Sequence, residues 1–275
     1  MTDERSLDEI IRYNVNDGVA TITIDRPEAR NALTPDQRNR LIDLFQQVSA
    51  DLNVRAVILA GTDKSFCTGA DLRARQPKNP RPDDAPDRAV GEPTRMIAMG
   101  AQRLIAAVMD CEKPVVAAVS GVAAGIGAHL AFASDIVVIG ESTRFIEVFV
   151  RRGIMPDGGG TYLLPRLVGP LKAKELMFFG DDIDADTAIS LGLANSQVTD
   201  EEVLSEAQRF ADRLATLPTR ALAYTKRLVN HSFESDRQRA FDEEATAQEL
   251  VVSTVDAQEG IKSFVEGRKP VFRGF

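Results

Sequence analysis

The sequence predicts an α/β protein whose largely parallel sheet is buried and is followed by a helical C-terminal region. Three observations support this. Apolar runs of strand length recur, segments with helical periodicity separate them, and strand signals almost stop after residue 184. Strands that are apolar on both faces are typical of parallel sheets covered by helices. We therefore expect a core over residues 1–199 and a helical oligomerisation region over 200–275.

Composition excludes several classes of protein. The chain has 275 residues and a formal net charge of -8, which is long enough for a sizeable core and argues against nucleic acid or anionic lipid as a partner. Its apolar runs are shorter than the roughly 18 residues of a membrane span, and its start lacks a targeting pattern, so we expect a cytoplasmic protein without membrane association. Cys67 and Cys111 lack CxxC spacing and there are only two histidines, so no metal site is expected.

The first half of the chain contains the expected strands. Residues 10–15 and 19–24 flank the turn sequence Asn-Asp-Gly, and the second of these segments alternates with period two, so together they predict a hairpin. Three further apolar runs, each followed by Gly or Ser-Gly, predict buried strands at 55–60, 114–119 and 135–139.

Helix signals are clearest at 35–50 and in the last third of the chain. Thr34 can cap the first of these helices with Gln37 three residues later, and Pro35 suits the first helical position. This helix should bury Leu41, Leu44, Phe45 and Val48. The later helices are expected at 185–191, 200–216, 219–230, 236–252 and 256–266.

A long segment between residues 73 and 93 is rich in Pro, Asp and Arg and poor in aliphatic residues. We expect a loop there. A loop of this length is more often functional or disordered than idle, so an active-site cover and a tolerated insertion both stay open.

Two stretches place small residues directly after predicted strands. SFCTGADL at 65–72 follows the strand at 55–60, and SGVAAGIGAHL at 120–130 follows the strand at 114–119. A strand that leads through such a turn into a helix presents backbone N–H groups to a negative oxygen. For the first stretch the structural alternative is a tight turn relieved by Gly69. The second lacks GxGxxG spacing, so the pair predicts an oxyanion hole rather than a dinucleotide site.

A series of short motifs runs along the chain in order. They are DRPEARNAL at 25–33, AVILAG at 56–61 with FCTGADL at 66–72, KPVVAAVSG at 113–121 with AGIG at 124–127, SDI at 134–136, GIMP at 153–156 with GGT at 159–161, and EG at 259–260 with FVEGRKP at 264–270. From Gly18 to Phe272 the chain thereby resembles the crotonase superfamily, also called the enoyl-CoA hydratase/isomerase family.

This resemblance implies a ββα superhelix whose helical C-terminal region forms a homotrimer, commonly assembled as a dimer of trimers. It implies an acyl-CoA substrate, with coenzyme A as part of that substrate and no separate cofactor. In the family, two backbone N–H groups hold the thioester oxygen as it gains enolate charge, and by motif they correspond to Ala70 and Ile126. One such donor contributes about 2.7–4 kcal/mol in a comparable site.

Two positions depart from the hydratases of the family, which carry a pair of glutamates for the attacking water. Here these positions hold His129 and Phe149, and Glu147 lies two residues from the second. Addition of water by the usual pair is therefore disfavoured. For His129, on an apolar helix, a hydrogen-bonded core residue and a catalytic residue both stay open.

Asp157, in MPDGGGT at 155–161, occupies the place at which double-bond isomerases of the family carry a catalytic aspartate. Here the chain most resembles the ring-epoxide and oxepin isomerases of phenylacetyl-CoA degradation. The structural alternative is that Asp157 caps a helix carrying residues 158–164. A helix N-terminus would also keep the carboxylate ionised, so both roles can coexist.

The resemblance also implies residues that bind the substrate and its coenzyme A: Arg30, Thr68, Gly69, Asp71, Leu72, Arg73, Gly125, Phe149 and Lys269. Arg73 and Lys269 fall where the family has basic side chains near the CoA phosphates, with plain surface charge as the alternative. The acyl pocket would depend on the loop at 73–93, on Met96 and Met99, and on Phe149.

Three hypotheses follow. In the first, the chain is an acyl-CoA isomerase in which Asp157 takes a proton and returns it at another carbon, with possible help from His129. In the second, it hydrates an enoyl-CoA, with His129 or Glu147 handling the water. In the third, it binds acyl-CoA without catalysis.

Overall fold

Two sheets form the core of the protein. A computed structural model describes residues 5–74, 82–86 and 89–275, so the parts of the predicted loop at 75–81 and 87–88 lie outside the described residues. The larger sheet has six strands in the order β1-β2-β3-β5-β7-β10, and the smaller has four in the order β4-β6-β8-β9. The β1–β2 and β8–β9 pairs are antiparallel and the other described pairs are parallel. This confirms the α/β prediction.

The sequence predicted five of the six strands of the larger sheet and missed its last strand and the whole smaller sheet. The larger sheet consists of β1 (Ile11–Asn16), β2 (Val19–Ile24), β3 (Ala56–Gly61), β5 (Val115–Val119), β7 (Ile136–Gly140) and β10 (Ser196–Val198). The smaller sheet consists of β4 (Ser65–Cys67), β6 (Val122–Ala124), β8 (Arg144–Ile146) and β9 (Asp182–Asp184). Strands of three residues are too short to show an alternating pattern, which is why the second sheet was not predicted.

The six helices expected at 35–50 and after residue 184 are present close to their expected ranges. Four others, Leu7–Ile10, Glu92–Ile97, Arg103–Met109 and Pro170–Phe179, were not predicted. In the part of the chain that the structure describes, the helices are α1 (Leu7–Ile10), α2 (Pro35–Ala50), α3 (Glu92–Ile97), α4 (Arg103–Met109), α5 (Ile126–Phe132), α6 (Gly160–Val168), α7 (Pro170–Phe179), α8 (Ala185–Ser190), α9 (Val203–Ala215), α10 (Thr219–Ser232), α11 (Arg237–Val252) and α12 (Val255–Glu266). The predicted cap of α2 is present, because Thr34 Oγ1 accepts the N–H of Gln37 and the Gln37 side chain accepts the N–H of Thr34. No helix of the described residues is long and apolar enough to cross a membrane.

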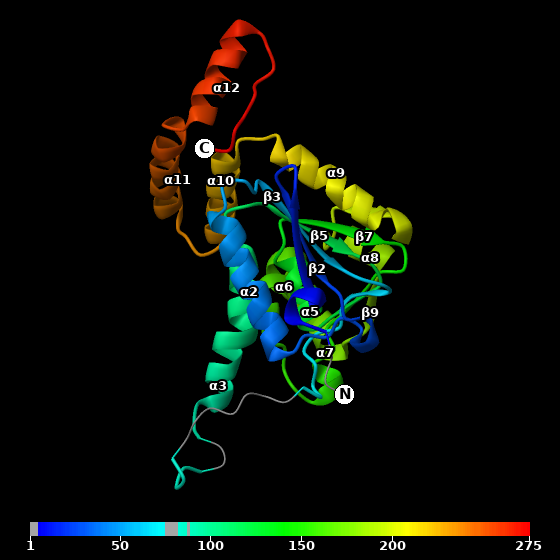
Figure 1. The fold of residues 1–275 in the computed structure, drawn as a ribbon. Coiled ribbons are helices and arrows are strands. Elements are labelled where there is room, and N and C mark those ends of the chain that lie inside the picture. The colour runs from blue at the N-terminus through cyan, green and yellow to red at the C-terminus, as the bar shows by residue number, and fades with distance from the viewer. Residues whose placement is uncertain (1–4, 75–81, 87–88) are drawn as a thin grey trace.

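The larger sheet is buried on both faces, as its apolar strands predicted. In β3, Val57 and Leu59 join the core with α2, α4 and α5. The alternate residues Ala56, Ile58 and Ala60 face α9. Figure 1 shows α9 along one face of the sheet, and α12 projecting away from it. Although α9 lies within the predicted C-terminal region, it completes the core. Oligomerisation through residues 200–275 stays a prediction.

The two small-residue stretches fold differently. The second runs as expected from β6 through Gly125 into α5. The first does not open a helix. Residues 71–74 form turns, and the next helix in the described part of the chain is α3, which begins at Glu92. The expectation of a helix directly after SFCTGADL is therefore wrong. Ala70 instead forms a bridge with Leu33, and the chain then turns.

Candidate active site

Two backbone turns meet at one edge of the smaller sheet. They follow β4 and β6, which are parallel neighbours, so both turns leave the sheet at the same edge. A Cβ placed on Gly69 would lie 3.9 Å from the backbone nitrogen of Ile126. The predicted oxyanion donors, the N–H groups of Ala70 and Ile126, therefore belong to adjacent segments.

The backbone N–H of Ala70 points away from Leu33, the residue to which its turn is hydrogen-bonded. Leu33 bridges Ala70 in parallel fashion. The N–H of Leu33 donates to the Gly69 carbonyl at 2.8 Å, and its carbonyl accepts the N–H of Asp71 at 2.9 Å. In such a bridge the central residue directs its own N–H to the opposite side. Within the described residues this N–H has no backbone partner, so it can donate to a ligand oxygen.

Ile126 offers a second N–H because it is the first residue of α5. The N–H groups of a first helical turn have no intrahelical acceptor, and no described backbone carbonyl outside the helix accepts this one. A close approach of α5 to β4 places it near Ala70. A Cβ on Gly127 would collide with the carbonyl oxygen of Cys67, so only glycine permits this approach.

We expect Gly127→Ala to lower both stability and activity. The added methyl must push α5 from β4, because a backbone carbonyl cannot rotate out of its way. Overpacking of this kind costs about 1–3 kcal/mol, and displacement of one donor should slow oxyanion chemistry about 100-fold. Urea unfolding and the rate of proton exchange next to the thioester measure the two effects. Gly260→Ala is the matched control, because its methyl would lie 3.4 Å from Phe272, an ordinary contact. A Gly127→Ala protein as stable and active as wild type would contradict this account.

Asp157 lies half-buried in the segment before α6, and the next residue in the chain lies beside Ile126. A Cβ on the next residue, Gly158, would lie 3.6 Å from the Ile126 side chain and 3.2 Å from Ala101. Burial raises the pKa of Asp157, and the coulombic interaction with His129 opposes this rise. The capping alternative is wrong: α6 begins at Gly160, its N-cap is Gly159, and no side chain caps it.

His129 is sealed in the core with an acidic partner. Its ring is 0% exposed, and Nε2 lies 3.0 and 3.3 Å from the two carboxylate oxygens of Glu147, which is 1% exposed. The ring also stacks on Phe149 with centroids 5.5 Å apart. Nδ1 has no hydrogen-bond partner among the described residues. This environment fits the first alternative for His129, a hydrogen-bonded core residue. The contact with Glu147 was not predicted, because 18 residues separate the two in the chain.

Six of the candidate substrate-binding residues surround the first turn: Arg30, Thr68, Gly69, Asp71, Leu72 and Arg73. The Arg30 carbonyl accepts the Thr68 N–H at 3.3 Å and its hydroxyl at 2.9 Å. Leu72 and Arg73 are exposed at the surface, whereas Asp71 is buried. Gly125 and Phe149 lie at the second turn, where a Cβ on Gly125 would be 3.5 Å from the Phe149 ring. Met96 on α3 and Met99 in the π-helical segment Ala98–Gln102 are exposed.

Lys269 does not join these residues within one chain. Its neighbours in the C-terminal tail are anchored elsewhere, because Arg55 Nη1 donates to the Phe272 carbonyl at 2.9 Å. Arg55 precedes the amino end of β3, whereas the turn at Ala70 comes after its carboxyl end. A strand of this length spans roughly 20 Å, so the tail is anchored at the far end of β3 from the donors.

Other reactive groups near the turns are few in the part of the chain that the structure describes. Burial raises the pKa of the Cys67 thiol to about 12, so this group is protonated at neutral pH and is a poor nucleophile. No group of three His, Cys, Asp or Glu side chains within the described ranges could hold a metal ion.

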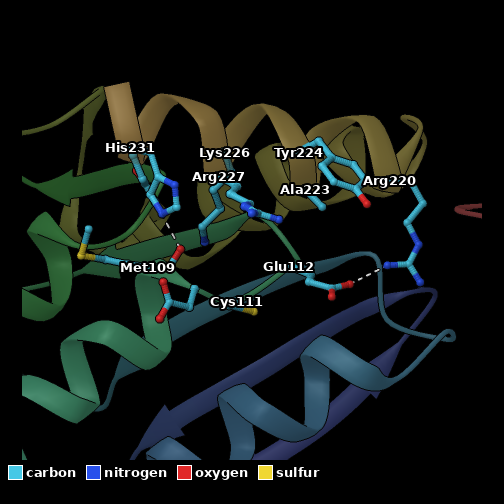
Figure 2. A pocket seen from close by; sticks show the side chains of 11 residues that line it. Met109, Cys111, Glu112, Arg220, Ala223, Tyr224, Lys226, Arg227 and His231 are labelled. Carbon is cyan, nitrogen blue, oxygen red and sulfur yellow. Dashed lines mark hydrogen bonds and ion pairs between the residues drawn. The ribbon is translucent and has the colours of Figure 1, made fainter. Parts of the chain in front are cut away.

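A pocket of about 360 Å³ lies away from the donors, between the end of α4 and the face of α10 (Figure 2). Its wall includes Glu112, which pairs with Arg220 at 2.5 Å. It also includes Lys226, which pairs with Asp135 at 2.8 Å. These charged side chains are already paired with each other and are not directed at a ligand. We therefore place the candidate site at Ala70, Ile126 and Asp157 rather than in this pocket.

Comparison with known proteins identifies the family. The profile of the enoyl-CoA hydratase/isomerase family matches residues 14–274. The chain is 35% identical over 272 residues to 1,2-epoxyphenylacetyl-CoA isomerase of Escherichia coli K12, covering 97% of this chain and 99% of that protein. It is 36% identical over 255 residues to crotonyl-CoA hydratase of Syntrophomonas wolfei, covering 92% and 94% respectively. A solved structure of an enoyl-CoA hydratase/isomerase from Cupriavidus metallidurans CH34 superposes with a TM-score of 0.86 at 32% identity, covering 98% of both chains. With this sequence match and this crotonase-like fold, the chain belongs to the enoyl-CoA hydratase/isomerase family of the crotonase superfamily.

Proposed function

We propose that this chain is an acyl-CoA isomerase that moves a proton, and with it a double bond, through an enolate. The observation that carries the proposal is the position of Asp157, a half-buried carboxylate whose neighbour Gly158 lies beside Ile126, so that an added Cβ would be 3.6 Å from the Ile126 side chain. The two positions of the hydratase glutamates hold the buried His129 and Phe149. The relative from Escherichia coli is named an isomerase, which also supports the proposal.

In the proposed cycle the N–H groups of Ala70 and Ile126 donate to the thioester oxygen. Asp157 removes a proton from carbon, and the electron pair of that C–H bond moves toward the thioester carbonyl to form an enolate. Because the two donors are held by the fold before reaction, they stabilise the new negative charge without rearranging. Asp157 then returns the proton to a different carbon. No water, metal or redox cofactor is consumed, and coenzyme A enters as part of the substrate.

Hydration is the second candidate, and family membership includes it because the Syntrophomonas relative is named a hydratase. It requires His129 or Glu147 to hold a water molecule. Their side chains are 0% and 1% exposed, and they already contact each other, so water would have to displace that contact. This burial is the reason that we prefer the isomerase.

The deciding experiment is proton exchange in deuterated water. We expect the wild-type protein to place deuterium on the carbon next to the carbonyl of a saturated acyl-CoA, detected by mass spectrometry, and to hydrate crotonyl-CoA poorly. Binding of the acyl-CoA without exchange would instead support a non-catalytic binding protein. Rapid hydration of crotonyl-CoA that His129→Ala abolishes would support the hydratase.

We also propose that α11 and α12 assemble the chain as a homotrimer or a dimer of trimers. These helices bury little within one chain and expose large apolar side chains: Phe241, Leu250, Val252, Val255, Ile261, Phe264 and Val265. Exposed apolar patches of this kind favour contact with another protein surface. Analytical ultracentrifugation of the purified protein tests the assembly.

A further inference from the structure

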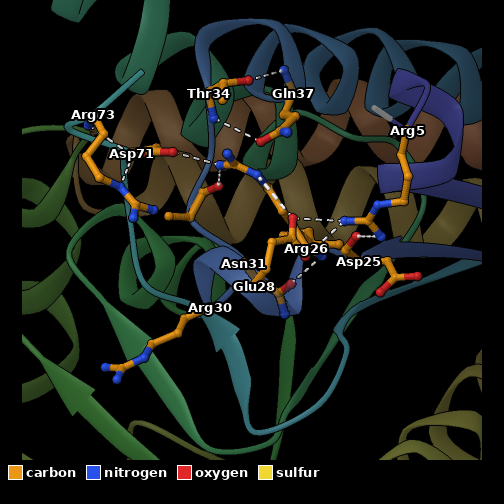
Figure 3. Close-up of polar contacts among 12 residues, drawn as sticks. Arg5, Asp25, Arg26, Glu28, Arg30, Asn31, Thr34, Gln37, Asp71 and Arg73 are labelled. Atoms are coloured by element: carbon orange, nitrogen blue, oxygen red, sulfur yellow. Dashed lines mark hydrogen bonds and ion pairs between the residues drawn. The ribbon is translucent and has the colours of Figure 1, made fainter. Parts of the chain in front are cut away.

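Asp71, next to the first donor, is held by a buried ion pair (Figure 3). Its side chain is 5% exposed, and Oδ2 accepts a hydrogen bond from Arg26 Nη1 at 2.8 Å. On the other side, Oδ1 accepts the N–H of Arg73 at 3.0 Å. Burial by itself raises the pKa of Asp71, but the hydrogen bonds from Arg26 and Arg73 outweigh it and lower the pKa overall. Asp71 is therefore an ionised carboxylate that is turned into the protein and paired with Arg26.

Arg26 is anchored at several points. Its side chain is only 11% exposed, and the Nη1 that binds Asp71 also donates to the Ala32 carbonyl at 3.0 Å. The Arg26 N–H donates to Asn31 Oδ1 at 2.7 Å. Asn31 is fully buried, and its Nδ2 donates to the carbonyls of Thr62 at 2.9 Å and Ser65 at 2.5 Å. The segment 26–33 is thus fixed to the end of β3 and the start of β4.

This anchored segment determines where the Ala70 N–H points. Leu33 bonds to the peptides on either side of Ala70, and the Arg26–Asp71 pair closes the same turn through side chains. Rotation of the peptide between Gly69 and Ala70 would swing the donor away from Ile126. That rotation would break the hydrogen bond from the Leu33 N–H to the Gly69 carbonyl, and the Arg26–Asp71 pair holds the next residue of the turn against the same segment.

We infer that the Arg26–Asp71 ion pair is a positioning device that aims the Ala70 N–H at the thioester oxygen. Arg26 does not touch the substrate in this account, and it acts through Asp71. The inference rests on the proposed function, because the direction of this N–H matters for rate only if an oxyanion develops there. Its signature is a loss of rate without a loss of substrate affinity, since the donor acts mainly when the oxygen gains charge.

Arg26→Gln and Asp71→Asn test the inference in the full-length protein. We expect each to slow proton exchange in deuterated water roughly 10- to 100-fold, with the Kd for the acyl-CoA within about twofold of wild type. The bound absorption of an aryl-acryloyl-CoA, which moves to longer wavelength when its carbonyl is polarised, should shift less than with wild type. The double variant should be no slower than the worse single variant, because both remove one interaction. Arg26→Lys, which keeps the charge, should recover part of the rate.

Arg12→Gln is the matched control, because Arg12 on β1 is 53% exposed and its pair with Asp25, at 3.5 Å, involves neither Arg26 nor Asp71. It should leave rate and spectrum unchanged. Circular dichroism verifies folding, and Asp71→Asn, which keeps the size and one acceptor oxygen, carries the test if Arg26→Gln does not fold. Wild-type rate and spectral shift in the folded variants would overturn the inference, as would a rise in Kd equal to the loss of rate. A wild-type protein with neither exchange nor spectral shift would instead refute the proposed function itself.

Discussion

Asp157→Asn is expected to lower the rate of proton exchange next to the thioester by about 1,000-fold. Asparagine has the same size but cannot accept the proton, whereas the backbone donors at Ala70 and Ile126 stay in place. The Kd for the acyl-CoA should therefore change little. Mass spectrometry of the deuterated thioester gives the rate, and calorimetry gives the Kd. Asp182→Asn is the control, because it changes an exposed carboxylate that pairs with Arg151 on the surface. A folded Asp157→Asn protein with wild-type exchange would refute the role of Asp157.

The pH profile of the same reaction identifies the base. A general base works only when ionised, so the exchange rate should fall as the pH drops through the pKa of Asp157. Burial raises that pKa above its ordinary value of 3.8, and the coulombic interaction with His129 only partly opposes the rise, so the fall should begin at a higher pH than for an exposed aspartate. The residual activity of Asp157→Asn should not show this fall in rate at low pH. If the same fall persists in the variant, the titrating group is another residue.

Glu147→Ala should produce the largest loss of stability. The substitution leaves the Nε2 of His129 without its acceptor in a site that is closed to solvent, and it opens a cavity beside the His129 ring. Breaking a buried pair by removing one partner costs about 3–5 kcal/mol of the free energy of unfolding. Urea unfolding at pH 7, at one protein concentration, measures this cost.

Two further variants show whether the loss comes from the pair. Glu147→Gln keeps an oxygen that can accept from His129, so its cost should be clearly smaller. Glu141→Ala removes an exposed carboxylate from the turn after β7 and should change stability by less than about 0.5 kcal/mol. If Glu147→Ala unfolds within about 1 kcal/mol of wild type, the pair contributes little to the fold.

Most of the secondary structure was readable because the signals are local and long. β3 and β5 are apolar throughout, and α2 carries its cap in the four residues from Thr34 to Gln37. The smaller sheet was missed, because β4 and β6 have three residues each and are defined by their pairing with distant strands. The helix expected after Asp71 was wrong for a related reason, because Ala70 pairs with the distant Leu33 and residues 72–74 then form turns.

In the candidate site, too, local motifs could be recognised in the sequence, whereas contacts between distant residues could not. The motifs around Ala70, Ile126 and Asp157 could be recognised in the sequence, although the roles of these residues stay predictions. The capping role of Asp157 was wrong because α6 starts later, with Gly159 as its N-cap at a φ of 84°. Glu147 was regarded as out of position, yet the fold turns it onto His129.

By itself, the sequence determined the class of fold, the family and the identity of the groups that could act, since these depend on residue types, periodicity and motif order. Only the tertiary structure decided which groups are buried and which meet. Three contacts join residues that are far apart in the chain: the packing of α5 on β4 at Gly127, the buried pair of His129 and Glu147, and the ion pair of Arg26 and Asp71. Such contacts depend on how strands and helices pack in three dimensions, and no local pattern encodes them.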